Sequence, residues 1–188
     1  MGRDKARVEL DGRSLIERAL AVLDGSCATV ALACGGAPRY AELGRALVLD
    51  RIEDGGPLAG IEAALASAPP GHVVVLAVDL PRVDAAFLEG LLARARAEDL
   101  DACLARSPFG LEPLCGVYHT RLAPRIRALL DRGERKVTSA LVFELEAHAL
   151  PRWAAIAVDA HHGATRNVNT PADLEAARAP LDERKATA

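Results

Sequence analysis

Two aspartates in this sequence stand where a carboxylate can reach a ligand. Asp50 follows the apolar run "RALVL", and Asp79 follows "VVVLAV". Runs of this kind predict strands buried inside a sheet, and ligands of open parallel sheets bind at the carboxyl ends of the strands. Two carboxylates there suit Mg²⁺, which takes one or two protein carboxylates and adds water and phosphate oxygens. A single Asp after a strand more often caps a turn, so the pair carries the prediction.

Three further features suit a polar or anionic ligand. Lys5, in "GRDKA", precedes the first expected helix, where its ammonium can pair with phosphate; a solvated lysine is the plainer alternative. The stretch "EDGGPLAG" (53–60) places glycines before a helix N-terminus, which attracts anions, although an ordinary glycine-rich loop has the same composition. Asn167 and Asn169 are two residues apart, so in an extended chain both amides point the same way.

The elements that would position these residues alternate between short apolar runs and amphipathic stretches. This alternation predicts an α/β fold, a Rossmann-like three-layer αβα arrangement with a mostly parallel sheet. The expected strands cover 28–34, 45–50, 72–79, 101–106, 112–119 and 153–159. The expected helices cover 14–23, 56–68, 84–98, 121–133, 137–145 and 169–178, the last with Thr170 as N-cap and Pro171 at its first position.

Length and composition favour one ordered domain. The chain has 188 residues, 51% of them hydrophobic, and we expect a single domain over 1–180 with a disordered tail over 181–188. A net charge of -3 argues against a nucleic-acid-binding surface. The apolar runs are too short to span a bilayer, and the four cysteines show no metal-binding spacing. We therefore expect a cytoplasmic protein that binds neither nucleic acid nor membrane.

Six stretches of the chain together resemble one family. They are "MGRDKARVELDGRSLIER", "LDRIEDGGPLAGIEAAL", "VVVLAVDLPRV", "EPLCGVYH", "DRGERKV" and "RNVNTPADL". Their order and spacing are similar to those of the molybdenum cofactor guanylyltransferases (molybdopterin-guanine dinucleotide biosynthesis protein A), within the nucleotidyltransferase superfamily. The resemblance runs over nearly the whole chain.

The resemblance implies an enzyme that transfers GMP from GTP to a molybdopterin-type molybdenum cofactor, uses Mg²⁺ and releases pyrophosphate. It implies GTP and molybdopterin as small-molecule partners, with molybdoenzymes or cofactor-biosynthesis proteins as protein partners. The implied roles are nucleotide contact for Lys5 and Asp50, Mg²⁺ binding for Asp79 and catalysis for Lys5 and Asp79. Four residues are implied for the cofactor substrate: Asn167, Asn169, Arg135 and Lys136.

The sequence departs from the family at its beginning. Family members start with a strand and a glycine-rich loop of the form LAGGxSxRMGxDKA, of which only "MGRDKA" is present here. That strand normally sits inside the sheet, so we expect a gap or an exposed apolar edge. A start codon assigned at the internal Met of a longer enzyme explains this better than a chain that has lost catalysis, because the candidate site residues remain. The family also tends to have a polar residue where Ala33 and Cys34 stand, which leaves base recognition open.

Three other functions remain possible on the sequence. A cytidylyltransferase acting on the same cofactor differs in the base it accepts, and a sugar-1-phosphate nucleotidyltransferase fits "NVNTPADL" less well. A truncated, non-catalytic relative would bind cofactor or a partner protein. It would release no pyrophosphate even with the upstream residues restored.

Overall fold

The computed structural model describes residues 4–108, 110–137, 152–157 and 167–178. Its helices are α1 (Leu15–Ser26), α2 (Gly56–Ser67), α3 (Ala85–Ala97), α4 (Ala123–Asp131) and α6 (Pro171–Arg178), with 3-10 turns η1 (Lys5–Arg7), η2 (Ala41–Leu43) and η3 (Thr120–Leu122). The expected tail over 181–188, and the expected helix over 137–145 beyond its first residue, lie outside the described residues.

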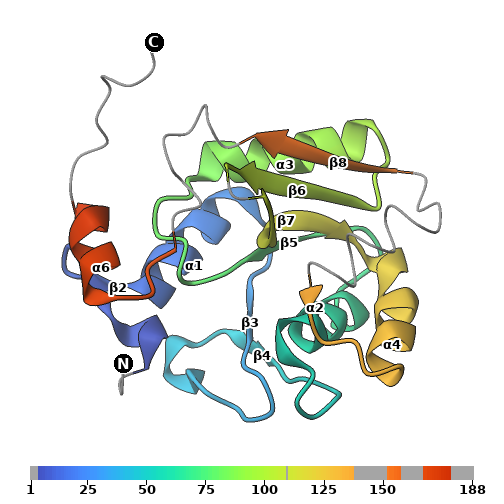
Figure 1. The fold of residues 1–188 in the computed structure, drawn as a ribbon, viewed down its shortest axis with the longest axis horizontal. Helices are drawn as coiled ribbons and strands as arrows, with labels where there is room; N and C mark the ends of the chain where they lie inside the picture. The colour runs from blue at the N-terminus through green and yellow to red at the C-terminus, as the bar shows by residue number, and fades with distance from the viewer. Residues whose placement is uncertain (1–3, 109, 138–151, 158–166, 179–188) are drawn as a thin grey trace.

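The largest sheet has the strand order β5-β7-β6-β8 (Figure 1). Its strands are β5 (His72–Leu76), β6 (Ala102–Ser107), β7 (Gly110–His119) and β8 (Trp153–Ala157). β7 runs antiparallel to both β5 and β6, and only β8 pairs in parallel with β6. The expectation of a mostly parallel sheet is therefore corrected to a mixed one. A very short connection joins β6 to β7, so the two form an antiparallel hairpin.

Two smaller sheets lie nearer the N-terminus. β3 (Ala31–Ala33) and β4 (Ala46–Val48) pair in parallel. β1 (Glu9–Leu10) and β2 (Arg13–Ser14) form a hairpin whose two turn residues, Asp11 and Gly12, have φ values of 53° and 76°. Positive φ at both central residues is the geometry of a type I′ turn, which favours glycine and aspartate.

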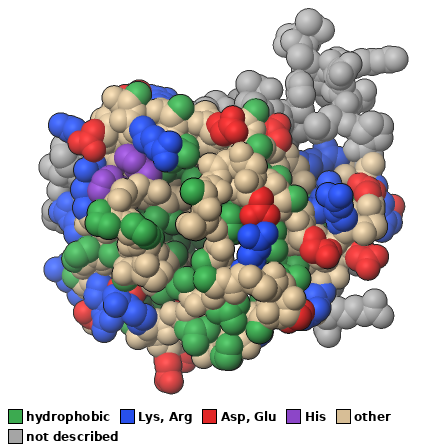
Figure 2. Space-filling view, turned by 180° about the vertical axis from the view of Figure 1, so that it is seen from behind, with side chains coloured by type: hydrophobic (Ala, Val, Ile, Leu, Met, Phe, Trp, Pro, Cys, Tyr) green, Lys and Arg blue, Asp and Glu red, His purple; other side chains and the backbone are tan. Residues whose placement is uncertain are grey.

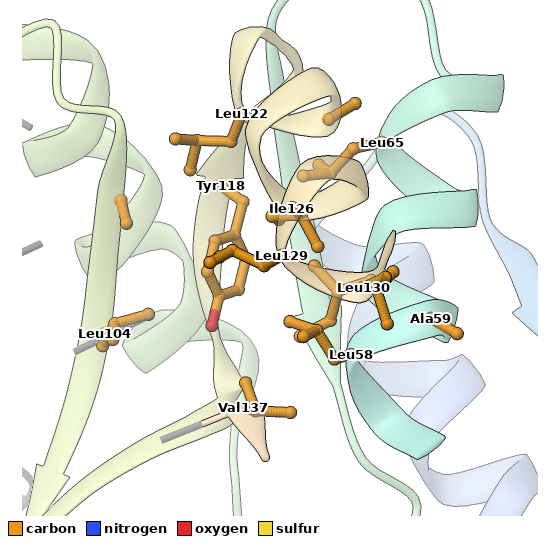
Figure 3. Packing of buried hydrophobic residues seen from close by; sticks show 13 residues of the cluster. Leu58, Ala59, Leu65, Leu104, Tyr118, Leu122, Ile126, Leu129, Leu130 and Val137 are labelled. Carbon is orange, nitrogen blue, oxygen red and sulfur yellow. The ribbon is translucent and has the colours of Figure 1, made fainter. Parts of the chain in front are cut away.

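Helices cover both faces of the four-stranded sheet, because successive side chains of a strand point to opposite faces. Leu104 and Tyr118 pack in one core cluster with α2 and α4, which Figure 3 shows from close by. Cys103 and Cys115 point the other way, into a second cluster with α3, and both are fully buried. The β-sheet thus lies between two helical layers (Figure 1).

Helix α1 lies beside α3 and also packs on the small β3–β4 sheet. Ser14 is its N-cap and forms a capping box with Glu17. Ile16 and Leu20 of α1 form a third cluster with side chains from β3 and the residues after it. The N-terminal segment is thereby attached to the rest of the protein through a modest apolar contact.

The apolar runs that form β3 and β5 are less buried than the interior strands that runs of this kind predict. β3 shows an exposed, buried, exposed pattern, and all five residues of β5 are half-buried. Among the described residues, β3 hydrogen-bonds only to β4, and β5 only to β7. Gly71 bonds to Thr120, just after β7, and Ala77 bonds to Leu114 of β7, so by alternation the backbone groups of Val74 and Leu76 face the unpaired edge. β3 and β5 therefore each have one edge without a partner strand among the described residues.

The surface is mixed in character. Charged side chains of both signs are interspersed over the face seen from behind, with hydrophobic side chains reaching the surface between them (Figure 2). Within the part of the chain that the structure describes, no helix is both long and apolar enough to cross a bilayer.

Candidate active site

Lys5 lies at the centre of the candidate site. It is the first residue of η1, which begins after Asp4, whose carboxylate accepts a hydrogen bond from the N–H of Ala6. The Nζ atom of Lys5 lies 2.8 Å from Oδ2 of Asp79 and 2.6 Å from Oδ1 of Asn169. Three segments that are far apart in the sequence therefore meet at one ammonium group.

Asp79 reaches this point just after β5. Its side chain is 23% exposed, and only its Oδ2 atom has a hydrogen bond to another described residue, from Lys5. The backbone oxygen of Asp79 accepts a hydrogen bond from the N–H of Val168 at 2.9 Å. That bond joins the end of β5 to the segment that carries the two asparagines.

The asparagine segment is extended, as predicted. Val168 is buried while Asn167 and Asn169 on either side are exposed, so both amides face away from the core. Thr170 caps α6, and the carboxylate of Asp173 accepts hydrogen bonds from the N–H groups of Asn169 and Thr170. This local network fixes the backbone that presents Asn169 to Lys5.

Asp50 lies just after β4. It makes no hydrogen bond to Lys5, Asp79 or Asn169, the three residues that meet at the Lys5 ammonium and are called the Lys5 cluster below. Its N–H donates to the carbonyl of Gly35, which holds it at the end of the β3–β4 sheet. Its side chain is half-buried and makes no hydrogen bond or ion pair with another described residue, and burial raises its pKa above the usual aspartate range. A half-buried carboxylate without a partner is available to a ligand.

The glycine-rich stretch 53–60 leads into α2, which begins at Gly56 with Pro57 in its first turn, as predicted. Gly55 is sterically required, because a Cβ there would lie 2.4 Å from the Cβ of Ala59. Gly60 lies beside Asp50, since a Cβ at Gly60 would be 3.7 Å from the Oδ1 atom of Asp50. Helix α2 therefore passes beside the Asp50 side chain, whereas the need for glycine at Gly55 is local to the start of the helix.

Arg135 and Lys136 differ in their surroundings. The guanidinium of Arg135 donates to the backbone carbonyls of Asp54, Leu130 and Glu134. It therefore joins the end of α4 to the loop before α2, while Lys136 is exposed. Neither residue bonds to the Lys5 cluster, and their expected role toward a second substrate stays a prediction.

Comparison with known proteins supplies the family. The family described as MobA-like NTP transferase domain matches residues 1–148, which is most of the chain. The chain belongs to this family. Within the MobA-like family, a probable molybdenum cofactor guanylyltransferase from Deinococcus radiodurans is 35% identical over 173 residues, covering 92% of this chain and 84% of the relative. A molybdenum cofactor guanylyltransferase from Desulfosudis oleivorans is 28% identical and covers 96% of this chain and 88% of the relative.

Solved structures agree with this MobA-like assignment. The molybdopterin-guanine dinucleotide biosynthesis protein A of Archaeoglobus fulgidus superposes with a TM-score of 0.77 at 26% identity, covering 94% of this chain and 90% of that one. The 2-C-methyl-D-erythritol 4-phosphate cytidylyltransferase of Thermus thermophilus gives a TM-score of 0.69 at 19% identity, which shows a shared fold alone. The architecture is that of an α/β nucleotidyltransferase.

One residue next to the MobA-like site escaped the sequence analysis. Tyr40 lies in the loop between β3 and β4, and its hydroxyl donates to the carboxylate of Asp4, with distances of 2.9 and 3.0 Å to the two oxygens. Its only signal in the sequence is a lone aromatic in a glycine- and proline-containing stretch. Nothing in that stretch indicates a bond to a residue 36 positions earlier.

The site as a whole combines one ammonium, one partly exposed carboxylate and exposed amides. Among the described residues, no group of three or more His, Cys, Asp or Glu side chains could enclose a metal ion. Asp79 does fit an ion that takes most of its ligands from water and substrate phosphate. Its Oδ1 atom accepts no hydrogen bond from another described residue and can therefore serve as a ligand. The arrangement suits a phosphorylated ligand rather than a buried structural metal.

Proposed function

We propose that this protein transfers GMP from GTP to a molybdopterin-type molybdenum cofactor in the cytoplasm, with Mg²⁺ and with release of pyrophosphate. The observation that carries the proposal is the meeting of Lys5, Asp79 and Asn169 at one point in a MobA-like domain. It is supported by relatives named molybdenum cofactor guanylyltransferases that align over most of the chain.

The chemistry asks for positioning and charge neutralisation more than for covalent participation. The terminal phosphate of molybdopterin would attack the α-phosphorus of GTP in line, forming one P–O bond while the bond to pyrophosphate breaks. Negative charge grows on the leaving oxygens during this step. A fixed ammonium stabilises such charge better than water does, since it needs no reorganisation.

Asp79 is the residue that would hold Mg²⁺. The ion, when bound, would neutralise charge on the phosphate oxygens and orient them. Asp79 is paired with Lys5 at 2.8 Å, so the carboxylate that would hold the ion and the ammonium lie side by side. Lys5 has three N–H donors and would contact the phosphates.

The remaining candidate residues keep the roles that the family resemblance implies for them. Asp50, half-buried and without a partner among the described residues, would accept hydrogen bonds from the nucleoside part of GTP. Asn167 and Asn169 would contact the cofactor substrate, as would Arg135 and Lys136.

The first test is a thermal-shift titration of the 188-residue chain with GTP, CTP and ATP, each with Mg²⁺. A ligand that binds only the folded state raises the melting temperature by mass action. We expect a shift with GTP and little with CTP or ATP. A shift with CTP alone would replace the proposal with a cytidylyltransferase.

Turnover is tested separately, by pyrophosphate release from GTP in the presence of molybdopterin. Release that depends on both substrates and on Mg²⁺ is the expected result. GTP binding without any release, including from a version extended at its N-terminus, would indicate a binding protein and overturn the transferase.

A further inference from the structure

The loop between β3 and β4 forms a bridge to the segment that carries Lys5. We propose that Tyr40 and Asp4 are a positioning pair for the Lys5 ammonium in the nucleotide site, an inference that rests on the proposed function for its link to GTP. The Tyr40 hydroxyl donates to the Asp4 carboxylate, and the same carboxylate accepts the N–H of Ala6 at 3.1 Å. One carboxylate thus joins the loop to the first turn of η1.

Lys5 is held on both sides in the sequence by contacts with this loop. Asp4, on one side, is bonded to Tyr40. Ala6, on the other, is only 6% exposed and lies in the apolar cluster to which the Tyr40 ring also belongs. Since Lys5 lies between these two anchors, Tyr40 controls where the lysine backbone sits, and therefore how Nζ reaches Asp79 and Asn169.

Tyr40 is itself firmly placed. The guanidinium groups of Arg7 and Arg39 lie 5.5 and 5.7 Å from the centre of its ring, within the range of cation–π attraction. Arg39 also donates to the carbonyl of Cys34 at the end of β3, and Arg7 forms an ion pair with Glu42. These contacts connect Tyr40 to β3 on one side and to η1 on the other.

The backbone of Tyr40 supports a role that local folding preference does not explain. Its φ is 65°, in the left-handed region, where a bulky side chain is uncommon. Such a conformation persists when surrounding contacts determine it, and these residues cluster near functional sites. Burial, and then the hydrogen bond to Asp4, raise the pKa of Tyr40, so its hydroxyl stays a proton donor at neutral pH.

The chemical environment of Lys5 gives a direct test. The chain is labelled with an amine-acetylating reagent at low dose, and mass spectrometry gives the rate at Lys5 relative to Lys136, which serves as the internal reference. Tyr40→Phe keeps the ring and removes only the hydroxyl. It is expected to raise relative labelling of Lys5 about threefold or more, because the ammonium is less often paired with Asp79.

The matched control is Tyr118→Phe, since these are the two tyrosines of the chain. The Tyr118 hydroxyl donates to the carbonyl of Pro113 inside the four-stranded sheet, and this hydrogen bond involves no residue that contacts Lys5. Its loss should lower the melting temperature and leave relative Lys5 labelling unchanged. Asp4→Ala should act like Tyr40→Phe, whereas Asp4→Asn, which still caps a helical turn and accepts a hydrogen bond, should retain most of the wild-type behaviour.

Nucleotide affinity links the pair to the proposed function. Tyr40→Phe is expected to weaken the binding of Mg²⁺–GTP about tenfold, the scale of losing one hydrogen bond to a charged group. Unchanged Lys5 labelling in Tyr40→Phe would overturn the positioning pair, whatever the nucleotide does. If Tyr40→Phe raises Lys5 labelling but the unmodified chain does not bind GTP, the positioning role of Tyr40 and Asp4 is supported and the nucleotide function is overturned. Raised labelling with unaltered GTP affinity would show that the pair does not serve nucleotide binding.

Discussion

The four-stranded sheet and the N-terminal region are held together in different ways. Around β6 and β7, side chains such as Leu104 and Tyr118 are fully buried, and helices cover both faces. Around η1 and β3, the apolar cluster is small, and much of the attachment is polar: Lys5 to Asp79, Tyr40 to Asp4. The four-stranded sheet with its helices is the scaffold of the protein. The N-terminal region contains the candidate site and is attached mainly by hydrogen bonds and ion pairs. Substitutions in the two regions should therefore separate activity from stability.

The largest expected effect is on activity, at Asp79. Asp79→Ala should reduce pyrophosphate release about 100- to 1000-fold, the range seen when a group that stabilises charge in a transition state is removed. The melting temperature should change by only a few degrees, because the side chain is partly exposed. Asp131→Ala, which removes an exposed carboxylate of α4 paired with Arg127, is the matched control and should leave turnover intact. Undiminished release from Asp79→Ala would refute the metal-site assignment.

The next effect is on the scaffold alone. Leu104 has no exposed surface, so Leu104→Ala should lower the free energy of unfolding by about 3 kcal/mol through lost burial and a residual cavity. Urea denaturation measures this change directly. Leu49→Ala is the control, since Leu49 is 40% exposed, and its change should stay within about 0.5 kcal/mol. Equal losses at both positions would mean that the scaffold core is not where the stability lies.

A smaller loss of stability is expected from a substitution where β6 and β7 pack closely. A Cβ at Gly116 would lie 2.7 Å from the Cδ2 atom of Leu104 and 3.1 Å from the backbone oxygen of Cys103. Gly116→Ala should therefore cost about 1–3 kcal/mol of unfolding free energy. Gly90→Ala on α3 meets no atom within 4 Å and should stabilise the protein by about 0.5–1 kcal/mol. Thermal unfolding of both variants in parallel gives the sign, and a stabilising Gly116→Ala would show that the two strands can move apart.

The smallest effect concerns Asp50 and its pH dependence. Burial raises the pKa of Asp50 in the folded protein above its unfolded value. The resulting stability is present below the unfolded pKa and is lost as the pH rises through the folded pKa. Asp50→Asn, which cannot ionise, should therefore raise the melting temperature at pH 7 by about 1–2 °C. The difference from the unmodified chain should vanish below about pH 4, and a gain that persists there would point to a cause other than ionisation.

Local signals in the sequence predicted helices α1, α2, α3, α4 and α6 to within a few residues of their observed bounds. Ser14 and Thr170 cap the helices that follow them, and the alternation around Val168 placed both asparagines outward. The rule that ligands bind at strand ends singled out Asp79, but nothing in the sequence predicted that Lys5 would pair with it. These features depend on residues near one another in the chain, or on a general property of α/β folds.

The features that the sequence did not predict depend on contacts between residues that are far apart in the chain. The antiparallel course of β7 follows from its hairpin with β6, and periodicity does not specify strand direction. The half-buried state of β5 follows from which strand lies beside it. Tyr40 shows the same limit, since its partner Asp4 is joined to it only by the folded arrangement of two loops.

The thiols of the scaffold have a consequence for redox chemistry. Burial raises the pKa of Cys103 to about 11 and that of Cys115 to about 12. Because the thiolate is the species that reacts with peroxides and disulfides, both sulfurs stay protonated and inert at neutral pH. Oxidants that modify surface thiols would therefore leave the centre of the sheet chemically unchanged for as long as the protein stays folded.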